Sequence, residues 1–163
     1  MGFRKAEEII MKKYNLGFDI WGLLLFVVIM IPNFIWFAVP APNDILRAES
    51  ATATLDAVAS VCQVLMVAAL CFVRNPERAR ADGRIISITP WTAAVFACCF
   101  LYFASWVVYY LGIVNVAVIF GLTIPPCLSF LFLAIDRKNM IAVIPCSVFA
   151  VCHLIYAVVN YIA

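Results

Sequence analysis

Polar side chains recur at helical spacing inside three otherwise apolar segments of this sequence, and they are the residues best suited to chemistry. Each set occupies one face of a helix, because its members follow one another at intervals of three or four residues or close to them. The three sets are Thr52, Asp56, Ser60 and Gln63; Tyr102, Ser105, Trp106 and Tyr109; and His153, Tyr156 and Asn160. The carboxylate of Asp56 could hold a cation or a proton, and His153 could exchange a proton or orient a ligand. The aromatic side chains could cover an apolar part of the same ligand.

We therefore expect a binding cavity between these three faces, completed by Asn33 from an earlier apolar segment. Counting about 1.5 Å per residue places Asn33, Asp56 and His153 at one depth, in the outer half of a membrane. The predicted ligand-binding residues are Asn33, Asp56, Gln63, Trp106, Tyr109, His153, Tyr156 and Asn160.

The two titratable residues of this set also have structural explanations. Asp56 lies near the start of its predicted helix, where an acid favours the helix N-terminus and reaches water. His153 could simply hydrogen-bond across helices. It is the single histidine of the chain, which is too little for a conventional metal site, so we expect no metal and no cofactor.

Three functions fit these residues. The leading hypothesis is a small-molecule or ion transporter, or a ligand-binding membrane protein, with an outward-facing polar and aromatic cavity. The second is a membrane-embedded enzyme for a lipid or isoprenoid substrate, with Asp56 and His153 as an acid/base pair. The third is a structural or regulatory subunit whose polar faces join helices. The sequence lacks the phosphate-binding and hydrolase motifs of soluble enzymes, so we favour a non-enzymatic function.

The segments that carry these residues have the composition of membrane spans. Hydrophobic residues make up 67% of the chain and charged residues 12%, and the mean hydropathy of +1.08 is far above that of soluble domains. Continuous apolar runs of about twenty residues predict helices, not the alternating strands of a barrel. We predict an all-α transmembrane bundle that forms a single domain over 1–163, with an interfacial helix over 3–14. The five spans are predicted at about 19–39, 52–73, 90–111, 114–135 and 140–162.

Lysine and arginine predict the orientation of the bundle. Ten of them fall in three segments on one side of the membrane: Arg4, Lys5, Lys12 and Lys13; Arg74, Arg78, Arg80 and Arg84; and Arg137 and Lys138. Only Arg47 lies on the other side, in a loop to Ser50 that Pro40 and Pro42 separate from the first span and that we expect to be exposed. The positive-inside rule then predicts a multi-pass protein of the cytoplasmic membrane, with the N-terminus inside and the C-terminus outside. The first span has full length, so we expect it to be retained and not cleaved as a signal peptide.

Other classes of function are excluded by composition. The seven cysteines all fall inside predicted spans and form no C-x-x-C pair in a loop, so we interpret them as apolar packing residues and not as redox groups. The net charge of +2 forms no basic patch, which argues against nucleic-acid binding. The expected partners are the lipid bilayer and a small molecule or ion.

Some of these residues also carry a resemblance to known proteins. The chain resembles a family of small, roughly five-span membrane proteins from Gram-positive bacteria in Ile31-Pro32-Asn33, in Asp56 early in the second span, and in Ile144-Pro145 followed by Phe149, His153 and Asn160. No activity is attached to that family, so the resemblance implies only that the outer polar layer matters. In span number and size the chain is also similar to the tryptophan-rich sensory (translocator) proteins, which bind porphyrins. Their tryptophan and proline motifs are missing here, so that similarity is architectural.

Overall fold

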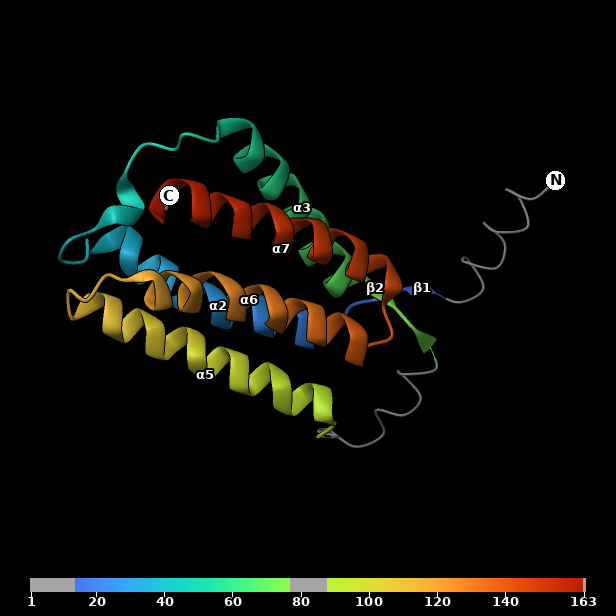
Figure 1. The fold of residues 1–163 in the computed structure, drawn as a ribbon. Helices are drawn as coiled ribbons and strands as arrows, with labels where there is room; N and C mark the ends of the chain where they lie inside the picture. Colours follow the sequence, from blue (N-terminus) through green and yellow to red (C-terminus); the bar gives the residue numbers. More distant parts are fainter. Residues whose placement is uncertain (1–13, 77–87, 163) are drawn as a thin grey trace.

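The computed structural model describes residues 14–76 and 88–162, and its five long helices pack as a bundle (Figure 1). The helices are α2 (Ile20–Ala38), α3 (Ala53–Phe72), α5 (Pro90–Tyr110), α6 (Val116–Asp136) and α7 (Met140–Tyr161). Each of them is long and apolar enough to cross a bilayer. The five predicted spans are therefore confirmed as helices, with ends within one or two residues of the prediction. The chain has an all-α fold and is a multi-pass membrane protein.

Three short elements accompany the helices. η1 (Ile45–Arg47) is a turn of 3-10 helix in the connection between α2 and α3. β1 (Asn15–Leu16) pairs antiparallel with β2 (Val73–Arg74), with Asn15 opposite Arg74. The interfacial helix predicted over 3–14 lies outside the described residues except for Tyr14, which is not helical.

Polar side chains fix where four of the helices begin. In each case the residue before the first turn accepts a hydrogen bond from a backbone N–H that has no partner within the helix. These caps are Asp19 for α2, Thr89 for α5, Asn115 for α6 and Asn139 for α7. Gly112, with a φ of 81°, forms the tight turn that follows α5, because this backbone conformation is easy only for glycine.

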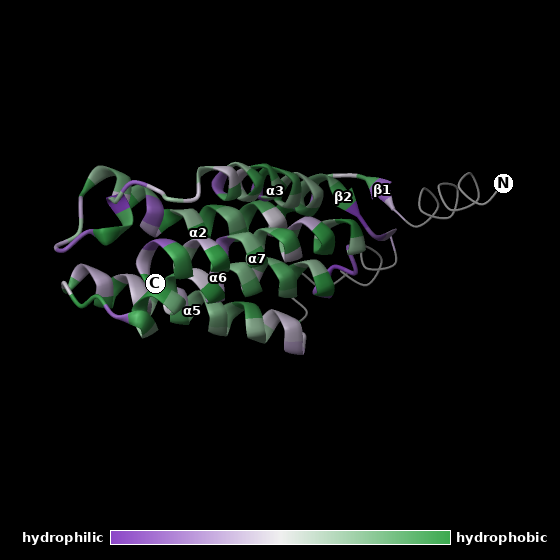
Figure 2. Ribbon diagram, turned by 45° about the horizontal axis from the view of Figure 1, so that its top comes forward, coloured by the Kyte–Doolittle hydropathy of each residue, from purple (hydrophilic) through white to green (hydrophobic). Residues whose placement is uncertain are grey.

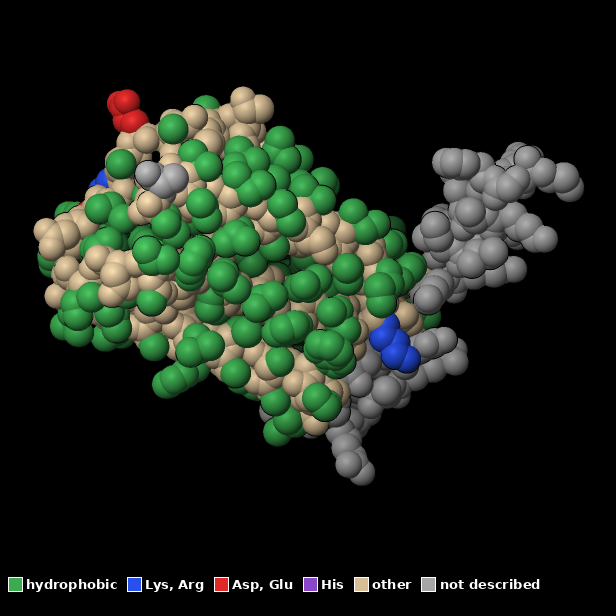
Figure 3. All heavy atoms as spheres, in the orientation of Figure 1, with side chains coloured by type: hydrophobic (Ala, Val, Ile, Leu, Met, Phe, Trp, Pro, Cys, Tyr) green, Lys and Arg blue, Asp and Glu red, His purple; other side chains and the backbone are tan. Residues whose placement is uncertain are grey.

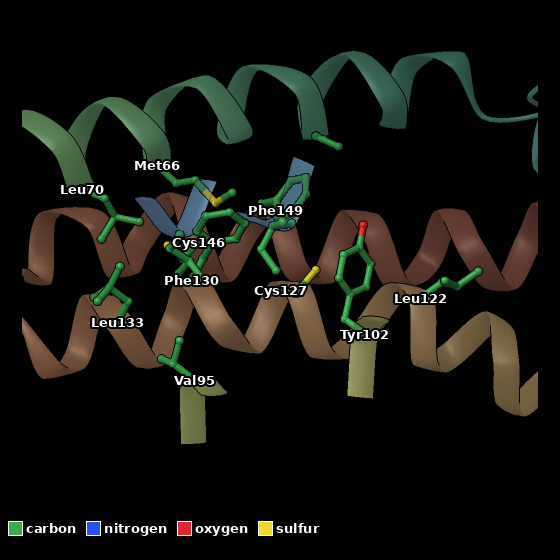
Figure 4. Close-up of a cluster of buried hydrophobic side chains, with 14 of the residues drawn as sticks. Met66, Leu70, Val95, Tyr102, Leu122, Cys127, Phe130, Leu133, Cys146 and Phe149 are labelled. Carbon is green, nitrogen blue, oxygen red and sulfur yellow. The ribbon is translucent and has the colours of Figure 1, made fainter. Parts of the chain in front are cut away.

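α6 is the central helix and the most buried of the five. It packs along α5 on one side and α7 on the other, and α7 also packs along α3 (Figure 1). α2 approaches the rest of the bundle less closely, mainly at α3. Figure 4 shows the core in which Met66 of α3, Phe130 of α6 and Phe149 of α7 meet. All seven cysteines are free thiols, and most of them are buried in this core.

The outer surface of the helices is suited to lipid. Hydrophobic side chains are spread across the face shown in Figure 3, and hydrophilic residues gather in the connections (Figure 2). On α2, Leu24, Val27, Phe34 and Phe37 are between 44% and 63% exposed. Such exposure would favour aggregation in water, but in a bilayer these side chains contact acyl chains.

The two ends of the bundle differ, and we name them here. The loop end contains residues 39–52 and 111–115, and the closed end contains residues 73–76 and 137–139. At the closed end Asn139 is 1% exposed, and its side-chain amide donates to the carbonyl oxygens of Ala69 (2.9 Å) and Val73 (2.8 Å). These bonds join the start of α7 to the end of α3. The backbone N–H of Asp19 donates to the carbonyl of Cys71 at 2.7 Å, which joins the start of α2 to the same region.

Candidate functional site

A cavity of about 390 Å³ lies inside the half of the bundle toward the loop end. Its wall combines residues of all five helices with Leu46 from the connection between α2 and α3. The lining residues are Ile29, Met30, Asn33, Trp36, Phe37, Leu46, Asp56, Ala59, Ser60, Gln63, Tyr102, Trp106, Leu122, Thr123, Pro126, Phe130, Phe149, His153, Tyr156, Ala157 and Tyr161. The volume is within the range of small-molecule sites, at its lower end.

Most of the predicted ligand-binding residues share this cavity. The six that line it are Asn33, Asp56, Gln63, Trp106, His153 and Tyr156. They come from α2, α3, α5 and α7, so helical periodicity read along separate segments identified faces that meet in space. That these side chains bind a ligand stays a prediction.

The structure places the other two predicted residues elsewhere. Tyr109 is completely buried, and its hydroxyl donates to the carboxylate of Asp44 at 2.8 Å. Asn160 connects the end of α7 to the start of α3. Its side-chain NH2 group donates to the hydroxyl of Thr52 (2.8 Å), and its side-chain carbonyl oxygen accepts from the backbone N–H of Ala51 (2.7 Å). Both side chains therefore hold the loop end together.

Several polar groups of the cavity have no hydrogen-bond partner in the protein. Within the described residues, the side chains of Asp56, Gln63 and His153 form no hydrogen bond and no ion pair. Asn33 differs, since its amide donates to the carbonyl of Ile29 (3.0 Å) and to the hydroxyl of Tyr102 (2.7 Å). A polar group without a partner is costly in an apolar medium, so the cavity must offer these groups water or a ligand.

Trp106 forms the centre of an aromatic wall and adds an unpaired donor. It is 5% exposed, and its indole N–H has no hydrogen-bond partner among the described residues. This N–H lies near the hydroxyl of Tyr102 but does not reach hydrogen-bonding geometry with it. The ring centroids of Trp36 and Tyr102 lie 6.5 and 6.3 Å from that of Trp106. These contacts bury the indole N–H, so Trp106 presents ring surface to the cavity.

On the opposite wall, three rings of α7 are stacked along the helix. The centroids of Phe149 and His153 are 5.1 Å apart with planes 15° from parallel, and those of His153 and Tyr156 are 6.3 Å apart and 3° from parallel. The hydroxyl of Tyr156 also shares a 2.8 Å hydrogen bond with that of Tyr161. The stack fixes the plane of the imidazole without using either of its nitrogens.

Asp56 and His153 line the same cavity but are not directly paired. No hydrogen bond or ion pair joins them in the described structure, although they are near enough to interact electrostatically. The described residues also contain no group of three or more histidine, cysteine or acidic side chains that could hold a metal ion.

A network around Asp44 at the loop end was missed by sequence reasoning. The Asp44 carboxylate accepts hydrogen bonds from the indole N–H of Trp36 (2.9 Å), the hydroxyl of Tyr109 (2.8 Å) and the guanidinium of Arg47 (2.9 Å). Partial burial would raise the pKa of Asp44, but these hydrogen bonds, with one from the backbone of Ala41, outweigh burial and hold that pKa below its ordinary value.

The expectation of an exposed loop between α2 and α3 holds for residues 42–43 and 47–50, but part of the connection packs against the bundle. Ala41 is buried, and Leu46 lines the cavity. The backbone N–H of Leu46 donates to the hydroxyl of Tyr109 at 3.3 Å, and the backbone carbonyl of Leu46 accepts from the hydroxyl of Tyr161 at 3.4 Å. We call residues 41–47 the cap, because they cover the loop end of the cavity. Pro40 and Pro42 stiffen this segment, and an acid two residues after the second proline was the signal in the sequence.

Comparison with known proteins does not identify the site. No protein-family model, no curated protein and no solved structure matches the chain. The resemblance to small five-span proteins of Gram-positive bacteria therefore has no support from these comparisons. The evidence for the site is its geometry.

Proposed function

We propose that this protein binds a small molecule or ion in the cavity beneath the cap and acts as a transporter or a ligand-binding protein of the cytoplasmic membrane. The observation that carries the proposal is the set of polar side chains that line the cavity without partners among the described residues, namely Asp56, Gln63 and His153. A bundle that needed only to be stable would satisfy such groups or replace them with apolar ones.

The proposed orientation puts the N-terminus inside and the cavity toward the outside. Its support is the charge of the connections: Arg74, Arg137 and Lys138 lie at the closed end, and Arg47 is the one basic residue that the described chain has at the loop end. The positive-inside rule favours the closed end in the cytoplasm.

The contacts favour this function over the two alternatives. In a structural subunit the polar faces would bond to one another. Asn160 does bond to Thr52 and Asn33 to Tyr102, but Asp56, Gln63 and His153 have no such bond among the described residues. An enzyme with Asp56 and His153 as an acid/base pair would need them in hydrogen-bond reach, directly or through one water. The described structure has no direct bond between them, so that function lacks specific support.

Blocking the cavity tests the proposal. Ala59 is buried and lines the cavity, while its neighbour Val58 is 43% exposed on the outer face of α3. We would measure thermal unfolding of the detergent-purified protein with sodium and potassium salts, amino acids, aromatic amines and aromatic carboxylates. A ligand at a hundred times its Kd stabilises by about 2.7 kcal/mol, a shift of several degrees in Tm.

The two matched variants decide the result. We expect at least one of these compounds to raise the Tm of the wild type and of Val58→Phe, and to leave the Tm of Ala59→Phe unchanged. If no compound stabilises the wild type, or if Ala59→Phe responds as the wild type does, the cavity is not a ligand site and the proposal fails.

A further inference from the structure

The charge and the walls of the cavity carry an inference about the class of ligand. Asp56 is the one acidic residue that lines the cavity, and no lysine or arginine of the described segments lines it. We propose that the ligand is a monovalent organic cation, an amine or quaternary ammonium compound with an apolar body, held by the carboxylate of Asp56 and by aromatic faces. This inference rests on the proposed function and specifies its ligand.

The surroundings of Asp56 leave its charge largely uncompensated. Its carboxylate receives no hydrogen bond from the described residues, and Arg47, the nearest basic side chain in sequence, is bound to Asp44. The partial positive charge at the start of α3 favours the ionised carboxylate only weakly, and partial burial in an apolar surrounding disfavours it. A cation in the cavity would provide the missing counter-charge.

The charge of the whole loop end points the same way. Its described residues include one basic side chain, Arg47, and two acidic ones, Asp44 and Glu49, and Asp56 follows in the first turn of α3. An excess of negative charge around the mouth of a low-dielectric cavity attracts cations and repels anions. Selection by sign therefore begins before the ligand reaches Asp56.

The aromatic lining favours an organic cation over a metal ion. Eight aromatic side chains line the cavity, including Trp36, Trp106 and Tyr156. Ring faces attract weakly hydrated cations, and Trp36 already holds the guanidinium of Arg47, with its carbon 4.9 Å from the ring centroid. A small inorganic cation needs several oxygen ligands in place of its water shell, and ring faces do not supply them.

Three probes of equal size and different charge test this inference. Benzyltrimethylammonium, neopentylbenzene and phenylmethanesulfonate share a benzyl group and the same number of non-hydrogen atoms, and they are cationic, neutral and anionic. Binding of tritiated benzyltrimethylammonium to the detergent-purified protein would be measured by scintillation proximity, with all three compounds as competitors. We expect competition only from the cation, with binding lost in Ala59→Phe and kept in Val58→Phe.

Variants of Asp56 and Glu49 show which carboxylate holds the cation. Asp56→Asn should weaken binding of the cation at least tenfold, and Asp56→Glu, which keeps the charge, should restore most of it. Glu49→Gln removes an equal charge from an exposed position outside the cavity and should bind within about twofold of the wild type. The Tm of each variant without ligand shows whether it is folded.

The possible failures are distinguishable. If neopentylbenzene competes as well as the cation and Asp56→Asn binds normally, the cavity is a ligand site but the inference about charge is wrong. If the tritiated cation does not bind the wild type, or if phenylmethanesulfonate competes as well as the unlabelled cation, the cation is excluded as the ligand class. The blocked variant Ala59→Phe and the wider set of compounds then decide whether the cavity binds anything.

Discussion

Two carboxylates, one in the cap and one in the first turn of α3, have opposite surroundings, and the difference separates a structural acid from an available one. Asp44 accepts hydrogen bonds from two aromatic side chains and from Arg47. Asp56 accepts none from the described residues and lines the cavity. Asp44 therefore stabilises the cap, and Asp56 is free to interact with the contents of the cavity.

The hydrogen bonds to Asp44 predict how the stability of the cap depends on pH. They hold the pKa of Asp44 in the folded protein below its unfolded value of 3.8, despite the opposing effect of partial burial. The ionised carboxylate thus stabilises the folded state above the unfolded pKa, and this contribution is lost as the pH falls through the folded pKa. We expect the Tm of the wild type to fall more steeply than that of Asp44→Asn between about pH 5 and about pH 3.

The exposed Glu49 provides the control for this measurement. Glu49→Gln removes a carboxylate from the same connection without removing any of these hydrogen bonds, so it should keep the steep dependence of the wild type. Equal slopes for Asp44→Asn and the wild type would show that the Asp44 network does not stabilise the folded protein.

At the scale of single residues, the sequence predicted the cavity better than its cap. Asp56, Gln63 and His153 could be found because helical periodicity places them on definite faces of apolar helices. Asp44 lies in an irregular connection, where no period relates position to direction. Its partners Trp36 and Tyr109 are distant in sequence or belong to another helix, so only the folded chain brings the three together.

Among the helices, α2 is the one held most locally. It approaches α3 closely at the closed end, where Gly22 lies against the backbone of Leu70, and a Cβ atom on Gly22 would be 2.7 Å from the carbonyl oxygen of Leu70. Farther along α2, the bonds of Asn33 with Tyr102 and of Trp36 with Asp44 reach the other elements. The first contact requires a glycine, because neither partner there is a flexible side chain.

A larger residue at Gly22 should therefore separate α2 from α3. We expect Gly22→Val to destabilise the protein by about 1–3 kcal/mol, because the close approach is between backbones and overpacking cannot be relieved by a rotamer change. Thermal unfolding in detergent measures the effect. Val27→Leu, which changes a lipid-facing residue of the same helix, should have a Tm within about a degree of the wild type. A Tm of Gly22→Val as high as that of Val27→Leu would contradict this close packing.

Hydropathy predicted the helices but could not predict which of them is central. The mean hydropathy of the five spans lies between 1.8 and 2.3, so lipid-facing and protein-facing helices have nearly the same composition. In water the exposed face of a helix must be polar, and this marks its orientation, whereas in a bilayer both faces are apolar. The central position of α6 and the loose packing of α2 therefore depend on the shapes of side chains, which a hydropathy pattern does not contain.

On the scale of the whole molecule, the two ends of the bundle differ in structure. The closed end joins α2, α3 and α7 through buried hydrogen bonds such as those of Asn139. The loop end includes the cap, and the cavity lies inside the half of the bundle next to it. The charges of the connections predict which end faces the cytoplasm, but the contacts within the protein are the same in either orientation.

Labelling of introduced cysteines tests the proposed orientation. Glu49 and Lys138 are exposed and lie at opposite ends of the bundle, while the native cysteines all lie within the five helices. We expect a membrane-impermeant maleimide added to intact cells to label Glu49→Cys, and to label Lys138→Cys only after the membrane is permeabilised. The wild type gives the background. The reverse pattern would put the cavity on the cytoplasmic side and overturn the proposed orientation.

The position of Asp56 has a consequence for the effect of membrane voltage. Asp56 belongs to the first turn of α3, so a cation that reaches it from the loop end crosses only a small part of the electric field. Most of the voltage drop lies across the packed half of the bundle, between the completely buried Met66 and Asn139 at the closed end. A unit charge that crosses the whole membrane changes in energy by about 2.3 kcal/mol for each 100 mV. Binding of the proposed cation at Asp56 would therefore be nearly independent of the membrane potential, whereas passage of a cation through the closed end would be strongly driven or opposed by it.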